Sequence, residues 1–165
     1  ELDLNKLCST TEDMRARGWE PSTIVLGLEK GSPRPHVRYK LGVGDEDGCV
    51  WMLHRLRLAN DEPVSLQWSY IPCALAPDLD THDLTGSLYY VLKNEYGIEL
   101  KTADQVIRTR GATLEEAQAL EISEGDAVFA IERVTCDPRG APVEHLDAVW
   151  RGDRYDLHVR LMGSE

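Results

Sequence analysis

The sequence predicts an α+β domain with a largely antiparallel sheet and helices packed on it. Three observations carry this prediction: apolar and polar residues alternate over several segments, helical patterns interrupt them, and the last third is rich in strands joined by tight turns. Strands joined by such turns must be antiparallel neighbours, because parallel pairing needs a long crossover. With 165 residues, 42% of them hydrophobic, the chain can bury one core without disulfides or a structural metal.

The first part of the chain alternates between capped helical segments and strands. Hydroxyl residues that can cap a helix precede acidic ones, and Gly18 closes the pattern. The expected elements are a helix from Thr10 or Thr11 to Gly18, strands over 24–28, 50–59 and 64–71, and a helical turn over 36–41. Between the last two strands, Asn60-Asp61-Glu62-Pro63 has the composition of a hairpin turn.

The second part contains two helices and four strands. Leu84, Leu88, Val91 and Leu92 share one helical face, and Gly97 ends that pattern. A second helix over 113–120 begins with the capping box Thr113-x-x-Glu116, whose side chains satisfy free backbone amides. Alternation and β-branched residues predict strands over 98–110, 127–136, 143–150 and 155–161.

The charge of the chain excludes some classes of partner. The 29 acidic residues exceed the 18 basic ones and give a net charge of -11, which argues against this chain wrapping nucleic acid. No apolar run approaches the ~20 residues that a membrane-spanning helix needs. No signal-peptide pattern opens the sequence either. We therefore expect a cytoplasmic protein with no membrane partner.

Cysteine and histidine spacing predicts no metal and no cofactor. The four cysteines form no Cys-x-x-Cys unit, so we expect buried free thiols rather than a disulfide or metal framework. The five histidines form no ligand pair, and His145 and Asp147 look isolated. The sequence also lacks a nucleophile elbow, a phosphate-binding Gly-Lys-Ser/Thr loop and a dinucleotide fingerprint. We expect no catalytic residue.

Two arginines stand out in the strand expected over 50–59. Alternation places Arg55 and Arg57 on one face with Trp51 and Leu53, while the other face is mostly apolar. The strand is therefore expected to be covered on both sides, where unpaired guanidinium groups are costly. Carboxylates of this acidic chain can pair with them, or the two groups can clamp a phosphate or carboxylate ligand. The pattern leaves both possibilities open.

Two further sets of residues are candidate ligand contacts. Ser87 and Tyr89 lie near an expected helix start, where free amides attract anions, although the same residues can serve as a helix cap and core packing. Glu144 and Trp150 share one face of an expected strand. A carboxylate and an indole suit a sugar, whose hydroxyls and ring they would contact. A solvated glutamate is the ordinary alternative.

Taken in order, several stretches of this chain resemble the UTRA domain, the effector-binding half of GntR-superfamily regulators of the histidine-utilisation-repressor (HutC) type. The resemblance covers residues 1–162. The stretches that carry it are Ser9-Thr10-Thr11-Glu12-Asp13-Met14, Arg55-Leu56-Arg57-Leu58-Ala59-Asn60-Asp61-Glu62-Pro63-Val64, Ser69-Tyr70-Ile71-Pro72, Ser87-Leu88-Tyr89, Pro142-Val143-Glu144 and Arg151-Gly152-Asp153-Arg154-Tyr155.

The resemblance implies a fold like that of chorismate lyase, with helices folded over a buried ligand pocket. It implies that Arg55 and Arg57 hold a phosphate and that Glu144 accepts sugar hydroxyls. The residues implied to complete the effector site are Ser87, Tyr89, Thr11 and Trp150. Trp150 stands where the family often has Tyr, which removes a phenol donor, and Thr10 stands where Phe is common.

The implied function is sensing rather than catalysis. The resemblance implies a homodimer that binds a small anionic metabolite and allosterically controls a winged-helix domain, which would precede residue 1 and contact operator DNA. A phosphosugar such as N-acetylglucosamine 6-phosphate fits the two arginines, Ser87 and Glu144. A carboxylate such as urocanate is an alternative effector, and an enzyme of the chorismate-lyase type is an alternative function.

Overall fold

A six-stranded antiparallel sheet forms the centre of the computed structural model, which describes residues 7, 9–44, 48–157, 161 and 163. The strand order across the sheet is β1-β2-β3-β6-β5-β4, and each neighbouring pair is antiparallel. The predicted α+β class with a largely antiparallel sheet is therefore confirmed. The strands are β1 (Pro21–Gly31), β2 (Val50–Ala59), β3 (Glu62–Pro72), β4 (Thr102–Gly111), β5 (Ala127–Cys136) and β6 (Pro142–Arg151).

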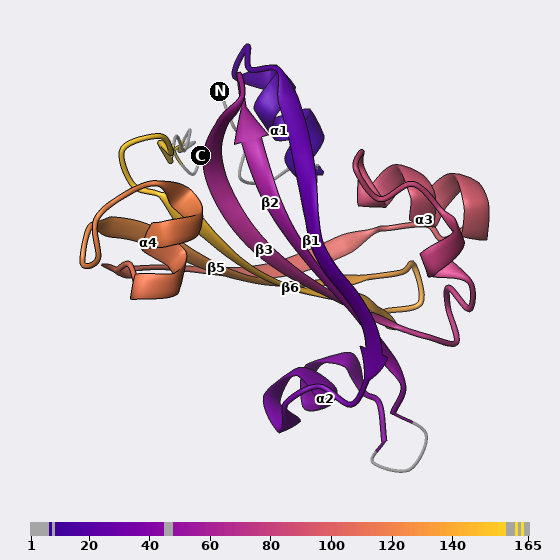
Figure 1. Cartoon of the computed structure of the whole chain (residues 1–165). Coiled ribbons are helices and arrows are strands. Elements are labelled where there is room, and N and C mark those ends of the chain that lie inside the picture. The colour runs from indigo at the N-terminus through magenta and orange to yellow at the C-terminus, as the bar shows by residue number, and fades with distance from the viewer. Residues whose placement is uncertain (1–6, 8, 45–47, 158–160, 162, 164–165) are drawn as a thin grey trace.

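Helices cover both faces of this sheet (Figure 1). They are α1 (Thr10–Ala16), α2 (Pro35–Leu41), the 3-10 turn η1 (Leu79–Thr81), α3 (Leu88–Tyr96) and α4 (Leu114–Leu120). Apolar side chains of α1 and α3 pack on one face, which we call the inner face. Those of α2 and α4 pack on the opposite, outer face. Successive residues of a strand point to opposite faces, so β2, β3, β5 and β6 contribute to both.

Side-chain caps fix the helix starts. The N-cap of α1 is Ser9, one residue before the expected Thr10 or Thr11, and its hydroxyl accepts from the Glu12 amide. The predicted capping box of α4 is present between Thr113 and Glu116. Helix α3 begins after the N-cap Ser87, so Leu84 lies before the helix rather than on its face.

Most expected strands agree with the structure to within a few residues. The hairpin between β2 and β3 turns at Asn60 and Asp61, which both have positive φ, and β3 begins at Glu62. The strand expected over 155–161 is absent from the described part of that range. Residues 155–157 have no regular secondary structure, and residues 158–160 lie outside the described part of the chain.

The expectation of free thiols is wrong for one pair of cysteines. Cys49 and Cys73 lie on neighbouring strand ends with a Cα–Cα distance of 5.5 Å and form a disulfide. The thiol of Cys136 is free, whereas Cys8 lies outside the described residues. Sequence spacing could not reveal the bridge, because the hairpin brings together two positions that are 24 residues apart. Among the described helices, none combines the length and apolarity needed to cross a bilayer.

Candidate functional site

Two arginines of β2 lie buried on the inner face. Arg55 and Arg57 are 3% and 2% exposed, respectively. Alternation along the strand places both side chains beneath α1 and α3. The predicted placement of two guanidinium groups side by side in an enclosed region is thus what the fold produces.

The hydrogen bonds of these arginines go to neutral groups. Arg55 donates through Nη1 to the backbone carbonyls of Leu84 and Gly86, at 3.2 and 3.0 Å. Arg57 donates through Nη2 to the Thr11 hydroxyl at 2.7 Å. Neither Nε atom has a hydrogen-bond partner, and within the described residues no carboxylate oxygen lies within 4.0 Å of either guanidinium group. Each group therefore retains an unused donor.

Burial disfavours the charged form of both guanidinium groups and so lowers their pKa values. It lowers the pKa of Arg55 to about 10, although the Glu144 carboxylate opposes this change. Burial also lowers the pKa of Arg57 to about 9, and the neighbouring charge of Arg55 contributes to the decrease. Both values lie above neutrality, so both side chains are cations at pH 7. A bound anion would relieve the burial cost and the mutual repulsion.

Glu144 and Tyr89 lie near the arginines on the inner face. Burial raises the pKa of Glu144, which is 2% exposed, and its Oε1 atom has no hydrogen-bond partner among the described residues. Burial also raises the pKa of Tyr89, whose hydroxyl lies 3.0 Å from Thr135 Oγ1. Tyr89 is therefore a neutral phenol at pH 7, and Glu144 offers a free acceptor.

A small internal cavity brings most of the expected site residues together. Its volume is about 10 Å³, which is enough for about one water molecule. Six of the seven expected residues line it: Thr11, Arg55, Arg57, Ser87, Tyr89 and Glu144. Trp150 does not line it. The Trp150 indole packs in the inner-face core beside Tyr155, with ring centroids 4.8 Å apart.

The cavity adjoins a larger groove between α1 and the segment from α3 to Leu100. The groove has a volume of about 970 Å³ and shares four lining residues with the cavity: Ser9, Thr11, Ser87 and Tyr89. Arg15 and Lys93 also line it, together with Glu12 and Glu99. A solvent-exposed entrance therefore lies directly beside the buried arginines.

Sequence reasoning missed several polar residues of the cavity. Ser69 and Gln67 come from β3, and Arg133 comes from β5. Gln67 lies directly opposite Arg55 in the register of the β2–β3 hairpin. The alternation of polar residues at 65, 67 and 69, combined with the position of the turn, could have identified this stripe. No comparable local pattern points to Arg133, because β5 reaches the cavity only through the assembled sheet.

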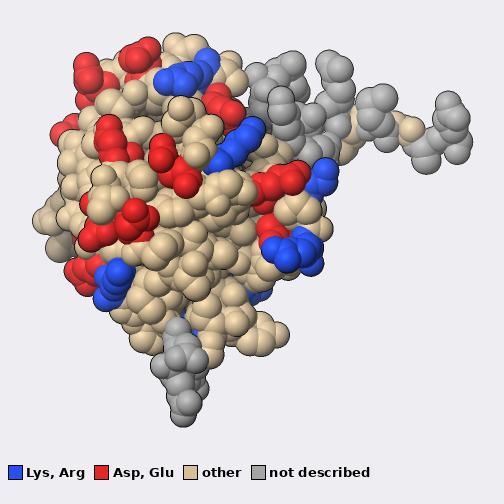
Figure 2. All heavy atoms as spheres, turned by 90° about the vertical axis from the view of Figure 1, so that its right-hand side faces the viewer, with Lys and Arg blue, Asp and Glu red and all other residues tan. Residues whose placement is uncertain are grey.

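The molecular face that carries α3 shows interspersed acidic and basic groups (Figure 2). Acidic groups are the more numerous, and no continuous basic patch is visible on this face. An acidic surface repels phosphate backbones. The described part of this face therefore does not have the charge expected of a nucleic-acid surface.

The chain is similar in sequence to a known domain family and to a transcriptional repressor. The family model described as the UTRA domain matches residues 16–156. The HTH-type transcriptional repressor NagR of Bacillus subtilis strain 168 is 34% identical over 155 residues, which are 94% of this chain and 63% of the repressor. The chain thus spans less than two thirds of the length of this relative.

Two solved structures share the fold of this chain. The effector domain of PhnF from Mycobacterium smegmatis has a TM-score of 0.86 and 25% identity, and the match covers 94% of this chain and 95% of that domain. A GntR-family transcriptional regulator from Enterococcus faecalis V583 has a TM-score of 0.77 and 26% identity, with 85% of this chain and 100% of that chain covered.

Proposed function

The chain belongs to the UTRA domain family, and from that premise we propose that it is the effector-binding part of a GntR-type transcription regulator. We propose further that its effector is a small anionic metabolite held by Arg55 and Arg57. One observation carries this proposal: two cations are buried side by side, and their hydrogen bonds go to neutral groups. An anion that entered the site would compensate both charges through charge-assisted hydrogen bonds.

The polar groups around the arginines favour a phosphosugar, with N-acetylglucosamine 6-phosphate as our preferred effector. The free Nε donors and the Ser87 hydroxyl suit phosphate oxygens. The free Oε1 of Glu144 suits a sugar hydroxyl, which can donate to it. A planar carboxylate such as urocanate has fewer hydroxyl groups to offer that acceptor, so it fits the pair of arginines but not the whole site.

The size of the cavity implies that binding moves a helix. A cavity of about 10 Å³ cannot hold a sugar phosphate, whereas the adjoining groove can. Separation of α1 from α3 would join the two spaces, because Thr11 and Ser87 line both. An anion at Arg57 would then replace the Thr11 hydroxyl as the acceptor of Nη2. Helix α1 is therefore the element that we expect to respond to the effector.

This response would be transmitted to DNA binding in the longer protein. We propose that a winged-helix domain precedes residue 1, that two copies form a homodimer in the cytoplasm, and that the effector shifts the balance between two dimer arrangements. A coupling free energy of about 1–3 kcal/mol is typical for such a shift. Relatives named as transcriptional regulators support a sensor rather than an enzyme.

Titration calorimetry on the purified chain tests the proposal. N-acetylglucosamine 6-phosphate should bind in a saturable manner, and N-acetylglucosamine should bind at least about 100-fold more weakly, because the phosphate supplies charge-assisted hydrogen bonds of about 1.5–3 kcal/mol each. Arg55→Ala and Arg57→Ala should each abolish detectable binding. Arg110→Ala is the matched control, since Arg110 lies on an exposed edge strand and pairs with Glu116.

Each alternative gives a different result. Absence of binding by any phosphosugar or organic acid, or unchanged binding in both cavity variants, would contradict the anion site. Saturable binding of urocanate alone would retain the anion sensor and remove the phosphosugar. Consumption of chorismate by the wild-type chain, lost in Arg55→Ala, would support the enzymatic alternative.

A further inference from the structure

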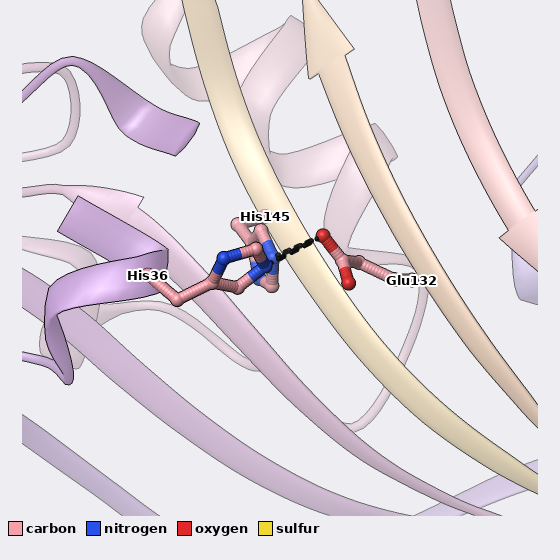
Figure 3. Close-up of side chains that lie close together, drawn as sticks. All are labelled: His36, Glu132 and His145. Atoms are coloured by element: carbon pink, nitrogen blue, oxygen red, sulfur yellow. Dashed lines mark hydrogen bonds and ion pairs between the residues drawn. The ribbon is translucent and has the colours of Figure 1, made fainter. Parts of the chain in front are cut away.

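A second cluster of chemically active side chains lies on the outer face of the sheet (Figure 3). His36 comes from α2, Glu132 from β5 and His145 from β6. Their imidazole nitrogens and carboxylate oxygen all lie within 4.8 Å of one another. Glu132 Oε1 is 2.9 Å from His36 Nε2 and 3.5 Å from His145 Nε2. Histidine spacing predicted no such group, because the fold joins positions that are 96 residues apart.

We propose that this cluster binds a divalent first-row transition metal ion, for which Zn²⁺ is the probe. Two imidazoles and one carboxylate form a donor set that zinc prefers. Metal–ligand bonds of about 2.0–2.2 Å in a tetrahedral arrangement place neighbouring ligand atoms roughly 3.3–3.5 Å apart. The 2.9 and 3.5 Å separations here are close to that spacing. The third pair, formed by the two histidine nitrogens, lies within 4.8 Å, so the imidazoles would have to approach each other by up to about 1.5 Å.

The burial of His145 without a hydrogen bond is a second observation that points to a ligand. Its side chain is completely buried, and among the described residues neither ring nitrogen makes a hydrogen bond, the nearest carboxylate oxygen being 3.5 Å from Nε2. Leaving two buried polar atoms without partners is costly. Nε2 faces Glu132, while Nδ1 lies 4.0 Å from Asp147 Oδ2. Metal-bound histidines usually present the second ring nitrogen to a carboxylate, and Asp147 stands where it can take that role.

The electrostatic surroundings suit a cation. Glu132 and Asp147 contribute two negative charges near the cluster. Arg34 contributes one positive charge and is held by Asp147 at 2.6 Å. The sum of these charges is negative, so a divalent ion would be attracted.

The cluster is also reachable and would have a structural effect. The His36 side chain is 49% exposed and that of Glu132 is 22% exposed, so an ion can enter from solvent. Three protein ligands leave a fourth position for water. The ion would connect α2 to β5 and β6. Because it would bind the folded chain only, it would raise the unfolding temperature.

Calorimetric titration of the untagged, chelator-treated chain with ZnCl2 tests the site. We expect one zinc ion per chain and a higher unfolding temperature in its presence. His36→Ala and Glu132→Gln should each weaken zinc binding at least tenfold and abolish the thermal shift. His36 is half exposed, and Gln keeps the size of Glu, so neither variant should prevent folding. MgCl2 should bind negligibly, because magnesium prefers oxygen ligands.

His82→Ala is the matched control, because His82 lies near Asp78 and Tyr96, away from the cluster. It should bind zinc as the wild type does. Absence of saturable zinc binding, or equal affinity in the wild type and both cluster variants, would overturn the proposal. The result is independent of the effector site: His36→Ala should bind N-acetylglucosamine 6-phosphate as the wild type does.

Discussion

The two faces of the sheet differ in the partners of their arginine side chains. On the inner face, Arg55 and Arg57 are buried and contact neutral oxygen atoms. On the outer face, Arg34 pairs with Asp147 and Arg110 pairs with Glu116. One strand, β6, contributes to both arrangements, because successive residues point to opposite faces.

This difference separates charges that the chain compensates from charges that, under the proposed function, a ligand would compensate. Exposed ion pairs contribute little free energy, about 0–1 kcal/mol, and removing one changes little. Buried cations without a carboxylate partner destabilise the unliganded chain but give a bound anion a strong interaction. Removal of a buried arginine on the inner face and removal of a paired arginine on the outer face should therefore change stability with opposite signs.

The largest effect on stability is expected for Arg57→Met. Methionine keeps a long apolar side chain but removes a buried charge that repels Arg55. The free energy of unfolding should rise by about 1–3 kcal/mol, because replacing buried charges by apolar groups is often stabilising. Urea denaturation measures this change, and calorimetry should show that phosphosugar binding is lost. A marked decrease in stability would mean that the chain already compensates Arg57 internally.

An effect of similar size and opposite sign is expected for Thr11→Val, which should lower stability. Valine has the shape of threonine but cannot accept the 2.7 Å hydrogen bond from Arg57. Loss of a hydrogen bond to a buried charged group should cost about 1.5–3 kcal/mol in the unliganded chain. Urea denaturation of the single variant and of the Thr11→Val, Arg57→Met double variant separates the two contributions. An equal cost of Thr11→Val in both backgrounds would contradict this contact.

Glu144→Gln should change the dependence of stability on pH. Burial raises the pKa of Glu144 above its ordinary value of 4.5, so the folded chain holds this proton to higher pH than the unfolded chain does. As pH rises from 4.5 through the folded-state pKa, this group therefore lowers the free energy of unfolding. Glutamine removes that contribution. The stability of the variant relative to the wild type should increase over this window, as measured by urea denaturation at several pH values, with Glu99→Gln as the exposed control.

The smallest effect is expected for Arg110→Met on an exposed edge strand. Its two hydrogen bonds to Glu116 are both 2.7 Å long, but the Arg110 side chain is 42% exposed. The variant should lose no more than about 1 kcal/mol of stability and should bind the phosphosugar as the wild type does. A loss of effector binding in this variant would show that the two faces are not independent.

The alternation in β2 predicted the most informative part of the site. Two residues of one strand that are two positions apart always project side by side, so the pairing of Arg55 and Arg57 needs no tertiary information. The same rule correctly put Glu144 and Trp150 on one face. Sharing a face does not place Trp150 in the cavity with Glu144, because six residues along a strand span about 20 Å. That distance is too long for one small ligand.

The sequence by itself determined the antiparallel α+β class, the pairing of the two arginines and the acidic character of the chain, because strand periodicity, turn chemistry and charge are local properties. Only the tertiary structure decided the contribution of Arg133, the bridge between Cys49 and Cys73, and the meeting of His36 with Glu132. These contacts depend on how distant segments are placed, and no local pattern encodes that placement. The small cavity around the arginines follows from the same packing, since residues of α1 and α3 line it together only on the assembled sheet.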